Sequence, residues 1–460
     1  MVDTWTSSSV DAHLDWIPGS GRKNLANAIR AAIRDGRWRP DAIIPSTRAL
    51  AADLGVARGT VTRVYADLTA EGYLRTSQGA PTRVATAGAD ALSPPDSAYA
   101  RKSTPRWTLM PGRPDPSLFP RDQWLISTRR VLQHTPNDTF GYGEPSGSLV
   151  LRTTLAAYLG RSRGVLADPA RIVIVAGFTQ AMTVLGHALA DLGVHEMAFE
   201  DPSIIRFRQF AAGAGQRIVG VPVDRDGLRV DELTSPAVVV TPAHQAPLGV
   251  TMAPARRTAL TRSGAIVIED DYDGEFRFDR QQVGALQALA PERVVYAGTA
   301  SKSLSPSLRL GWLVLPRALV DPVIAALTRS GAQPPMIDQL VLADLISSGA
   351  FDRHIRRSRL YYRARRDRLV AALPDHVRPD GISAGLQLFV PLSARAEAAI
   401  PASAARHSLA IEPVSPHAIR ADDPLTGLMI GYGAPPKPAF TGAVDALLAV
   451  LRDVSPGPAA

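Results

Sequence analysis

The chain has 460 residues, of which 45% are hydrophobic and 20% are charged, and 51 Lys/Arg against 43 Asp/Glu give a formal net charge of +8. This composition is typical of folded globular proteins and not of disordered ones, and the length predicts about three domain-sized units. Because the chain has no cysteine, disulfide frameworks, cysteine-ligated zinc, iron–sulfur clusters and thiol nucleophiles are excluded.

The N-terminal segment, MVDTWTSSSVDAHLDWIP, contains no basic stretch followed by an apolar one, so it does not resemble a secretory signal. The longest apolar runs, such as 237–240 and 265–268, are far shorter than the roughly 18 residues that span a bilayer. We therefore expect a cytoplasmic protein without a membrane partner.

Positive charge is concentrated near the N-terminus. Residues 20–85 hold eleven Lys/Arg and five Asp/Glu, whereas the 353 residues after position 107 carry a net charge of only +4. A local excess of cations is typical of modules that bind an anionic partner such as nucleic acid.

The same N-terminal segment has the pattern of three helices and a hairpin. Leu25, Ile29 and Ile33 share one helix face, Ser46 is a good N-cap, and Gly72 ends the third apolar-periodic stretch. The predicted elements are helices over 22–36, 46–54 and 59–72 and strands over 73–75 and 82–84.

This order predicts a winged helix-turn-helix, whose second helix of the pair fits the DNA major groove. The words IPSTRALAADLGVARGTVTRVYADLTAEGYL resemble the GntR-type DNA-binding domain over about residues 20–85. Outward position and this resemblance together imply DNA contacts from Arg48, Arg58, Thr60, Thr62 and Arg63, and from Gly79 at the wing.

Residues 86–107, TAGADALSPPDSAYARKSTPRW, lack apolar periodicity and are rich in small residues and proline. This composition is typical of a linker, and an ordered surface loop is the alternative. The predicted organisation is a DNA-binding domain over 18–85, a linker over 86–107 and a second domain over 108–455.

The second domain alternates short β-rich runs with helical patterns, which predicts an α/β fold with a mainly parallel sheet. The predicted strands are 172–175, 196–200, 217–221, 237–241, 265–269, 293–297 and 310–315. Ligands of such sheets bind beyond the carboxyl ends of the strands, so residues that follow the strands are the informative ones.

Chemically suited side chains follow three of these strands. Lys302 follows 293–297, and its amine can form a Schiff base with an aldehyde. Asp270 follows 265–269, and its carboxylate can keep a pyridine nitrogen protonated. The helix that begins near Phe178 offers backbone N–H groups to a phosphate, which Thr299 and Arg309 would also bind. The ligand that needs all three is pyridoxal 5′-phosphate (PLP).

The words GYGEPSG, VAGFTQAM, EDPS, TPAHQAPLG, IEDDYDGEFRF and YAGTASKSLSPSLRLGW resemble the fold-type I PLP-dependent aminotransferases. Together with the GntR-type segment, they resemble the MocR subfamily of transcriptional regulators over nearly the whole chain. The resemblance implies that Lys302 forms the PLP aldimine and that Tyr142 reaches the phosphate across a homodimer interface. We expect no metal site. The cofactor-binding residues that it implies are Asp270, Tyr272, Phe178, Thr179, Thr299, Ser301, Arg309, Tyr142, His244 and Gln245.

Three positions depart from the aminotransferase pattern. Ile204 stands where a tyrosine usually stacks on the cofactor ring. Ala246 stands at the usual asparagine, and His244 or Gln245 can fill in. LTGLMIGY over 425–432 contains no carboxylate-binding arginine, and Arg420 is the nearest candidate. These departures put amino-acid binding in doubt more than cofactor binding.

We therefore expect a DNA-binding regulator that senses PLP, or an amino compound through its aldimine with PLP, and that controls genes of vitamin B6 or amino-compound metabolism. The alternative is a catalytically active PLP-dependent aminotransferase with an accessory DNA-binding domain, because the lysine, acid and tyrosine are all present. A third possibility is a degenerate domain that holds no cofactor. The sequence leaves enzymatic activity, operator sequence and direction of regulation open.

Overall fold

A computed structural model describes residues 14–17, 19–77, 80–85, 105–278, 283–420 and 424–454. The chain divides into two compact units, Met1–Thr104 and Pro105–Ala460, which we call the head and the body and describe separately. Gly79, residues 86–104 of the predicted linker and position 455 lie outside the described residues. No described helix combines the length and apolar character needed to cross a lipid bilayer.

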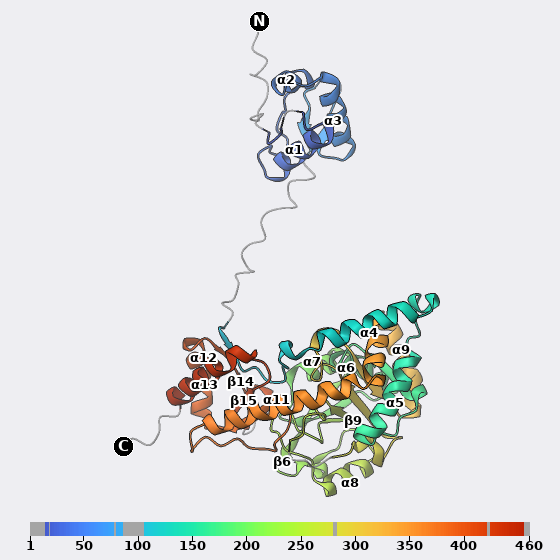
Figure 1. Ribbon diagram of the computed structural model, residues 1–460, viewed down its shortest axis with the longest axis vertical. Coiled ribbons are helices and arrows are strands. Elements are labelled where there is room, and N and C mark those ends of the chain that lie inside the picture. Colours follow the sequence, from blue (N-terminus) through green and yellow to red (C-terminus); the bar gives the residue numbers. More distant parts are fainter. Residues whose placement is uncertain are drawn as a thin grey trace. The chain divides into compact units, whose positions relative to one another are not determined.

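The head contains the predicted three helices and hairpin, and Figure 1 labels the helices and colours this unit blue. Ser46 caps the second helix through a bond from the Ala49 N–H at 3.1 Å, as its position predicts. Gly55 and Gly72 have positive φ and end the second and third helices. The elements are α1 (Arg22–Arg34), α2 (Thr47–Asp53), α3 (Arg58–Ala70), β1 (Leu74–Arg75) and β2 (Arg83–Val84).

The apolar faces of these elements form one small core. Leu25 and Ile29 of α1 are fully buried against Leu50 of α2 and Leu68 of α3. The Tyr65 hydroxyl donates to the Pro45 carbonyl at 2.8 Å and so fixes α3 against the segment that leads into α2. The core therefore sets the angle between the two helices that a winged helix-turn-helix presents to DNA.

The body is built on an eight-stranded sheet in the order β4-β11-β10-β9-β8-β5-β6-β7. Strands β10, β9, β8, β5 and β6 pair in parallel, while β11 is antiparallel to both of its neighbours and β7 is antiparallel to β6. The prediction of a mainly parallel sheet holds for this central run. The strands are β4 (Ile172–Val175), β5 (Glu196–Asp201), β6 (Arg217–Asp224), β7 (Gly227–Leu228), β8 (Ala237–Val240), β9 (Ile266–Asp271), β10 (Val294–Thr299) and β11 (Gly311–Val314).

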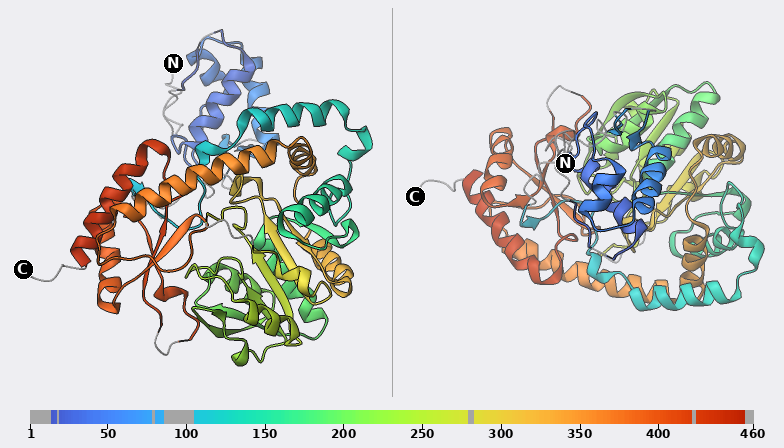
Figure 2. Two further views of the ribbon diagram at one scale, coloured as in Figure 1. Left: turned by 60° about the horizontal axis from the view of Figure 1, so that its bottom comes forward. Right: turned by 90° about the horizontal axis from the view of Figure 1, so that it is seen from above.

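Helices cover both faces of this sheet, as the two views of Figure 2 show. In β4, Ile172 and Ile174 point into the core cluster with α5 and α11, while Val173 and Val175 point into the cluster with α6 and α9. A strand that is buried on both faces needs a continuous apolar run, and IVIV supplies one. The helices are α4 (Arg121–His134), α5 (Leu149–Arg163), α6 (Phe178–Asp191), α7 (Ile205–Gly213), α8 (Pro254–Arg262), α9 (Arg317–Ser330), α10 (Met336–Ser347) and α11 (Ala350–Ala372).

A smaller sheet, β12-β15-β14, forms the C-terminal part of the body. Its helices α12 and α13 pack against each other, and the long helix α11 runs from the large sheet toward them (Figures 1 and 2). A separate two-residue parallel pair joins β3, at the start of the body, to β13. The elements are β3 (Trp107–Thr108), β12 (Gln387–Pro391), β13 (Leu409–Ala410), β14 (Glu412–Pro413), β15 (Gly427–Gly431), α12 (Ala394–Arg406) and α13 (Phe440–Val454).

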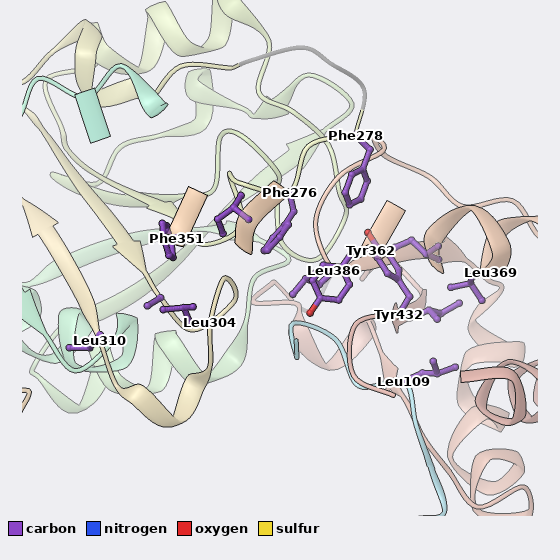
Figure 3. Close-up of a cluster of buried hydrophobic side chains, with 14 of the residues drawn as sticks. Leu109, Phe276, Phe278, Leu304, Leu310, Phe351, Tyr362, Leu369, Leu386 and Tyr432 are labelled. Carbon is purple, nitrogen blue, oxygen red and sulfur yellow. The ribbon is translucent and has the colours of Figure 1, made fainter. Parts of the chain in front are cut away.

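One continuous core cluster links the two sheets. Figure 3 shows Leu304 and Phe351 on the side of the large sheet and Tyr362, Leu386 and Tyr432 toward the small one. Tyr362 and Tyr432 are almost fully buried, and the Tyr432 hydroxyl donates to the Gly385 carbonyl at 2.6 Å. The loops between the two sheets are thus held by close packing, and these loops form the site described next.

Candidate functional site

A cavity of 930 Å³ lies at the carboxyl ends of β9 and β10. Its wall includes eight residues that the sequence singles out, from four separate segments of the chain. Parallel strands bring their carboxyl ends to one sheet edge, which explains why residues distant in sequence meet here. The eight are Phe178, Thr179, Asp270, Tyr272, Thr299, Ser301, Lys302 and Arg309.

Lys302 lies in the turn just after β10. Its Nζ donates a hydrogen bond to the Gly112 carbonyl at 2.6 Å, so the chain segment that begins the body also reaches the cavity. Burial lowers the pKa of the Lys302 amine, and the nearby carboxylates of Asp270 and Asp273 oppose that shift. A lowered amine pKa increases the neutral, nucleophilic fraction that attacks an aldehyde.

Asp270 is the second residue with a clear chemical signature. The sequence predicted it just after a strand, but β9 continues to Asp271, so Asp270 is a strand residue near the carboxyl end. Its side chain is buried, and its Oδ1 atom has no hydrogen-bond partner among the described residues. Burial raises the pKa of Asp270 well above its usual range, and Lys302 opposes this. A buried carboxyl group without a donor fits a ligand that supplies a protonated ring nitrogen.

Groups suited to an anion gather at the start of α6. The N-cap, Gly177, has φ 82°, and a Cβ added there would lie 3.8 Å from Arg309 Nη1 and 4.0 Å from Ser301 Oγ. The first N–H groups of a helix have no acceptor within the helix, so those of Phe178 and Thr179 are available to a phosphate. Thr299 Oγ1 accepts from the Ser301 N–H at 3.1 Å and so fixes the turn that carries Lys302.

Half-buried Tyr272 contacts the buried His244, which in turn contacts the buried Asp273. The His244 Nδ1 atom lies 2.8 Å from Asp273 Oδ2 and 3.0 Å from the Tyr272 hydroxyl. An ionised carboxylate only accepts, so Nδ1 must carry the proton that it donates to Asp273. The Tyr272 hydroxyl cannot then donate to Nδ1, and it lies at the wall of the cavity within hydrogen-bonding reach of Asp273. His244 therefore acts on the cavity through Tyr272.

The remaining predicted residues do not line the cavity. Gln245 is buried behind the wall, where its amide donates to the Pro202 carbonyl at 2.9 Å and accepts from the Leu248 N–H at 2.9 Å. Tyr142 is fully exposed on its own chain. Ile204 and Ala246 do line the cavity, so both departures from the aminotransferase pattern face the ligand space.

The structure shows which arginines line the cavity and could bind the carboxylate of a ligand. Arg420 does not line the cavity and instead pairs with Glu232 at 3.1 Å. Two arginines that the sequence analysis missed, Arg113 and Arg206, do line it, and both lower the pKa of Lys302. Neither makes an ion pair among the described residues. The signal for Arg206 was its place just beyond the EDPS word, whereas nothing local distinguishes Arg113.

The surface of the head carries both paired and unpaired arginines. Five of its arginines pair with carboxylates: Arg22, Arg30, Arg37, Arg75 and Arg83. The exposed residues Arg48, Arg58 and Arg63 have no carboxylate partner in the described part of the head, and Arg58 and Arg63 lie in the first two turns of α3. Thr62 is exposed and Thr60 is half-buried on the same helix. Unpaired arginines on α3 are available to phosphates or base edges.

Comparisons with known proteins follow this division of the chain. Residues 22–84 match the model of the bacterial regulatory proteins of the gntR family. Residues 119–416 match the model of aminotransferase class I and II.

Several curated relatives span both regions. The chain is 35% identical over 398 residues to the probable rhizopine catabolism regulatory protein MocR of Rhizobium meliloti, covering 80% of each chain. It is 32% identical over 374 residues to the HTH-type pyridoxine biosynthesis transcriptional regulator PdxR of Corynebacterium glutamicum, covering 78% of this chain and 80% of that one. It is also 33% identical to the HTH-type transcriptional regulator TauR of Rhodobacter capsulatus, with coverage of 78% and 80%.

Among solved structures, an archaeal alanine:glyoxylate aminotransferase is similar with a TM-score of 0.70 and 25% identity, over 79% of this chain and 94% of that one. The α-aminoadipate aminotransferase LysN of Thermus thermophilus is similar in fold with a TM-score of 0.67 and 22% identity, over 76% and 92%. That structure holds N-(5′-phosphopyridoxyl)-L-leucine.

Proposed function

This chain belongs to the MocR-type, GntR-family helix-turn-helix transcriptional regulators with an aminotransferase class I and II domain, and we propose that its body senses PLP. The helix-turn-helix of the head implies DNA binding. The observation that carries the proposal is the buried, unpartnered Oδ1 of Asp270 in the same cavity as Lys302. We further propose that the protein acts in the cytoplasm, where both operator DNA and free PLP are present.

The cavity residues fit PLP in three places. Asp270 would meet the ring nitrogen, Lys302 would hold the aldehyde carbon, and the α6 N-terminus with Arg309 would take the phosphate. When bound, PLP supplies an electrophilic carbon and an electron-withdrawing ring. The chain's own residues would orient it: the Tyr272 hydroxyl would meet the ring substituent next to the aldehyde, and His244 with Asp273 would hold that hydroxyl in place.

Regulation requires that the ligand bind two conformations of the protein with different affinity. We propose a homodimer in which Tyr142 of one protomer contacts the phosphate site of its partner, because Tyr142 is fully exposed on its own chain. Two heads would then bind two operator half-sites. The name of the relative PdxR, a pyridoxine biosynthesis regulator, supports vitamin B6 genes as targets.

The second ligand class is an amino compound that reacts at the PLP carbon. Arg113 and Arg206 favour this class, because two guanidinium groups without carboxylate partners in the described residues face the cavity near Lys302. The same geometry supports the alternative function, a working aminotransferase. Steady turnover of amino acids by the purified protein at ordinary enzyme rates would establish that alternative and remove the need for a purely sensing role.

The test measures binding of the full-length protein to promoter fragments from its own gene neighbourhood, with and without PLP. We expect a visible absorption band from lysine-bound PLP and a change in fragment affinity when PLP is added. A protein that binds the fragment identically at every PLP concentration would contradict the sensing role. A protein that takes up no PLP would contradict the cofactor assignment.

A further inference from the structure

Helix α11 carries a concentration of charge that the overall composition of the body hides. It contains eight arginines and two aspartates, a net charge of +6, whereas residues 108–460 together carry only +4. The rest of the body is therefore slightly acidic. The net charge of the whole body therefore does not reveal the cations of this helix.

Most of these arginines face solvent. The apolar and aromatic side chains of α11 form one buried face, which packs into the core between the two sheets. Six exposed arginines occupy the other half of the helix, together with Leu360, Ala364 and Asp367. The row from the first of them to the last spans about 22 Å at an axial rise of about 1.5 Å per residue. The six are Arg353, Arg356, Arg357, Arg359, Arg363 and Arg368.

Few of these charges are neutralised within the chain. Arg363 lies 3.8 Å from Asp367, the sole carboxylate among the exposed residues of α11. Arg359 donates to the Glu275 carbonyl at 2.8 Å and Arg368 to the Thr441 hydroxyl at 2.9 Å, and neither acceptor is charged. Arg356 and Arg357 have no hydrogen-bond or ion-pair partner among the described residues.

Three exposed arginines elsewhere on the body are instead paired with carboxylates. Arg329 pairs with Asp191 at 2.5 Å, Arg406 pairs with Asp453 at 2.6 Å, and Arg217 pairs with Glu196. A fixed row of guanidinium groups along a rigid helix has the charge and spacing to follow a line of phosphates.

We propose that this arginine face of α11 binds the phosphate backbone of duplex DNA, as a second DNA contact in addition to that of the head. DNA is the polyanion that fits, because the head of the same chain binds DNA and thereby raises its local concentration near the body. The inference rests on DNA binding by the head and adds a sequence-independent contribution from the body. It predicts that the body increases affinity and salt dependence without reading bases.

The test compares full-length variants on one long duplex by fluorescence anisotropy between about 50 mM and about 200 mM salt. The first variant is R353Q/R356Q/R357Q. The matched control is R217Q/R329Q/R406Q, which removes the same number of charges from ion-paired arginines elsewhere on the body. The slope of log affinity against log salt should weaken by close to one for each α11 arginine removed, and by much less in the control. Circular dichroism and PLP absorbance verify that both variants fold.

Three results would overturn the proposal. An unchanged slope in the α11 variant would show that the helix does not touch DNA. An equal loss in both variants would show that net charge alone is responsible. A change of oligomeric state in the α11 variant, measured by sedimentation, would assign the face to a second copy of the chain. If the wild-type protein binds no duplex at all, DNA binding by the head fails, a result distinct from all three.

Discussion

The head and the body differ in where they keep their polar groups. Among the described residues of the head, no charged, amide or hydroxyl-bearing side chain other than Tyr65 is buried, and its arginines lie at the surface. The body buries the carboxyl groups of Glu200 and Asp270 in the wall of one cavity. A surface of cations suits a large polyanion, and a buried set of directed polar groups suits one small ligand. The two units are therefore suited to partners of opposite kinds.

The sharpest way to separate the two units is the variant K302A. Removal of the amine should abolish the visible absorbance of lysine-bound PLP completely, because no other described lysine lines the cavity. DNA binding by the head should persist, since Lys302 belongs to the body. Absorbance spectra and DNA titrations of the same preparation test both. Loss of all DNA affinity in K302A would show that the head depends on the occupied body.

Removal of a buried charge in the body should lower the free energy of unfolding substantially. Asp271 accepts from Arg163 Nε at 2.6 Å and from the Tyr296 hydroxyl at 2.7 Å, with both charged side chains almost fully buried. The variant D271N leaves the Arg163 charge uncompensated and should lower the free energy of unfolding by roughly 3–5 kcal/mol.

The matched control for that loss is D191N, which removes an exposed partner of Arg329. It should cost less than about 1 kcal/mol, because an exposed pair is screened by water. Urea denaturation of both variants gives the two values. Equal costs would contradict the contrast between buried and exposed charge.

Substitution of an exposed arginine in the head should lower the affinity for DNA and leave the stability of the fold unchanged. Arg58 is exposed at the start of α3 without a carboxylate partner in the described residues, so R58A should leave the fold intact. Loss of a contact to phosphate or guanine should weaken operator binding by roughly 1–3 kcal/mol, or about 5- to 150-fold. The control is R22A, whose arginine pairs with Asp67 at 3.7 Å and should matter far less. A changed PLP spectrum in R58A would contradict the separation of the two units.

The two units should also differ in the sign of their pH dependence. Burial raises the pKa of Glu200 to about 7 and that of Glu269 to about 7, so the folded body binds more protons than the unfolded chain between the unfolded and folded pKa values. Body stability should therefore fall as pH rises from about 5 to about 7, by at most about 1.4 kcal/mol per pH unit for each group. E200Q should reduce this slope.

In the head, Arg30 lowers the pKa of Glu71, so the head should gain a little stability as pH rises through the carboxyl range. Hydrogen exchange at several pH values resolves the two units within one protein. The same sign in both units would contradict the comparison.

Local patterns made the head and the large sheet predictable. The Ser46 cap, the period of Leu25, Ile29 and Ile33, and the apolar run of β4 each satisfy short-range rules, and the structure places all of them as predicted. The sequence did not predict the small sheet or the β3–β13 pair, in which β13 and β14 are two residues long and pair with strands distant in the sequence. Pairing of that kind depends on tertiary packing and leaves no local period.

The cavity was predictable where the chemistry follows a strand and hidden where it does not. Lys302 and Asp270 stand at strand ends, so their types and positions suffice. Arg113 lies in a stretch without periodicity, and only the folded chain brings it near Lys302. The charge of α11 was hidden for another reason, since a charge balance over the whole body cancels a helix of net +6 against the acids of the rest of the body.

The hydrogen bond from Lys302 Nζ to the Gly112 carbonyl also connects the cavity with the first residues of the body. Gly112 lies five positions after Trp107, at the beginning of the body. The Trp107 N–H donates a hydrogen bond to the Ser408 carbonyl. When a ligand reacts with the Lys302 amine, the Gly112 carbonyl loses this hydrogen bond and needs another donor. The segment 107–112 is then the part of the chain that changes first. From this hydrogen bond, the path to the first residues of the body is thus only a few peptide bonds long. A signal along it would need no reorganisation of the large sheet.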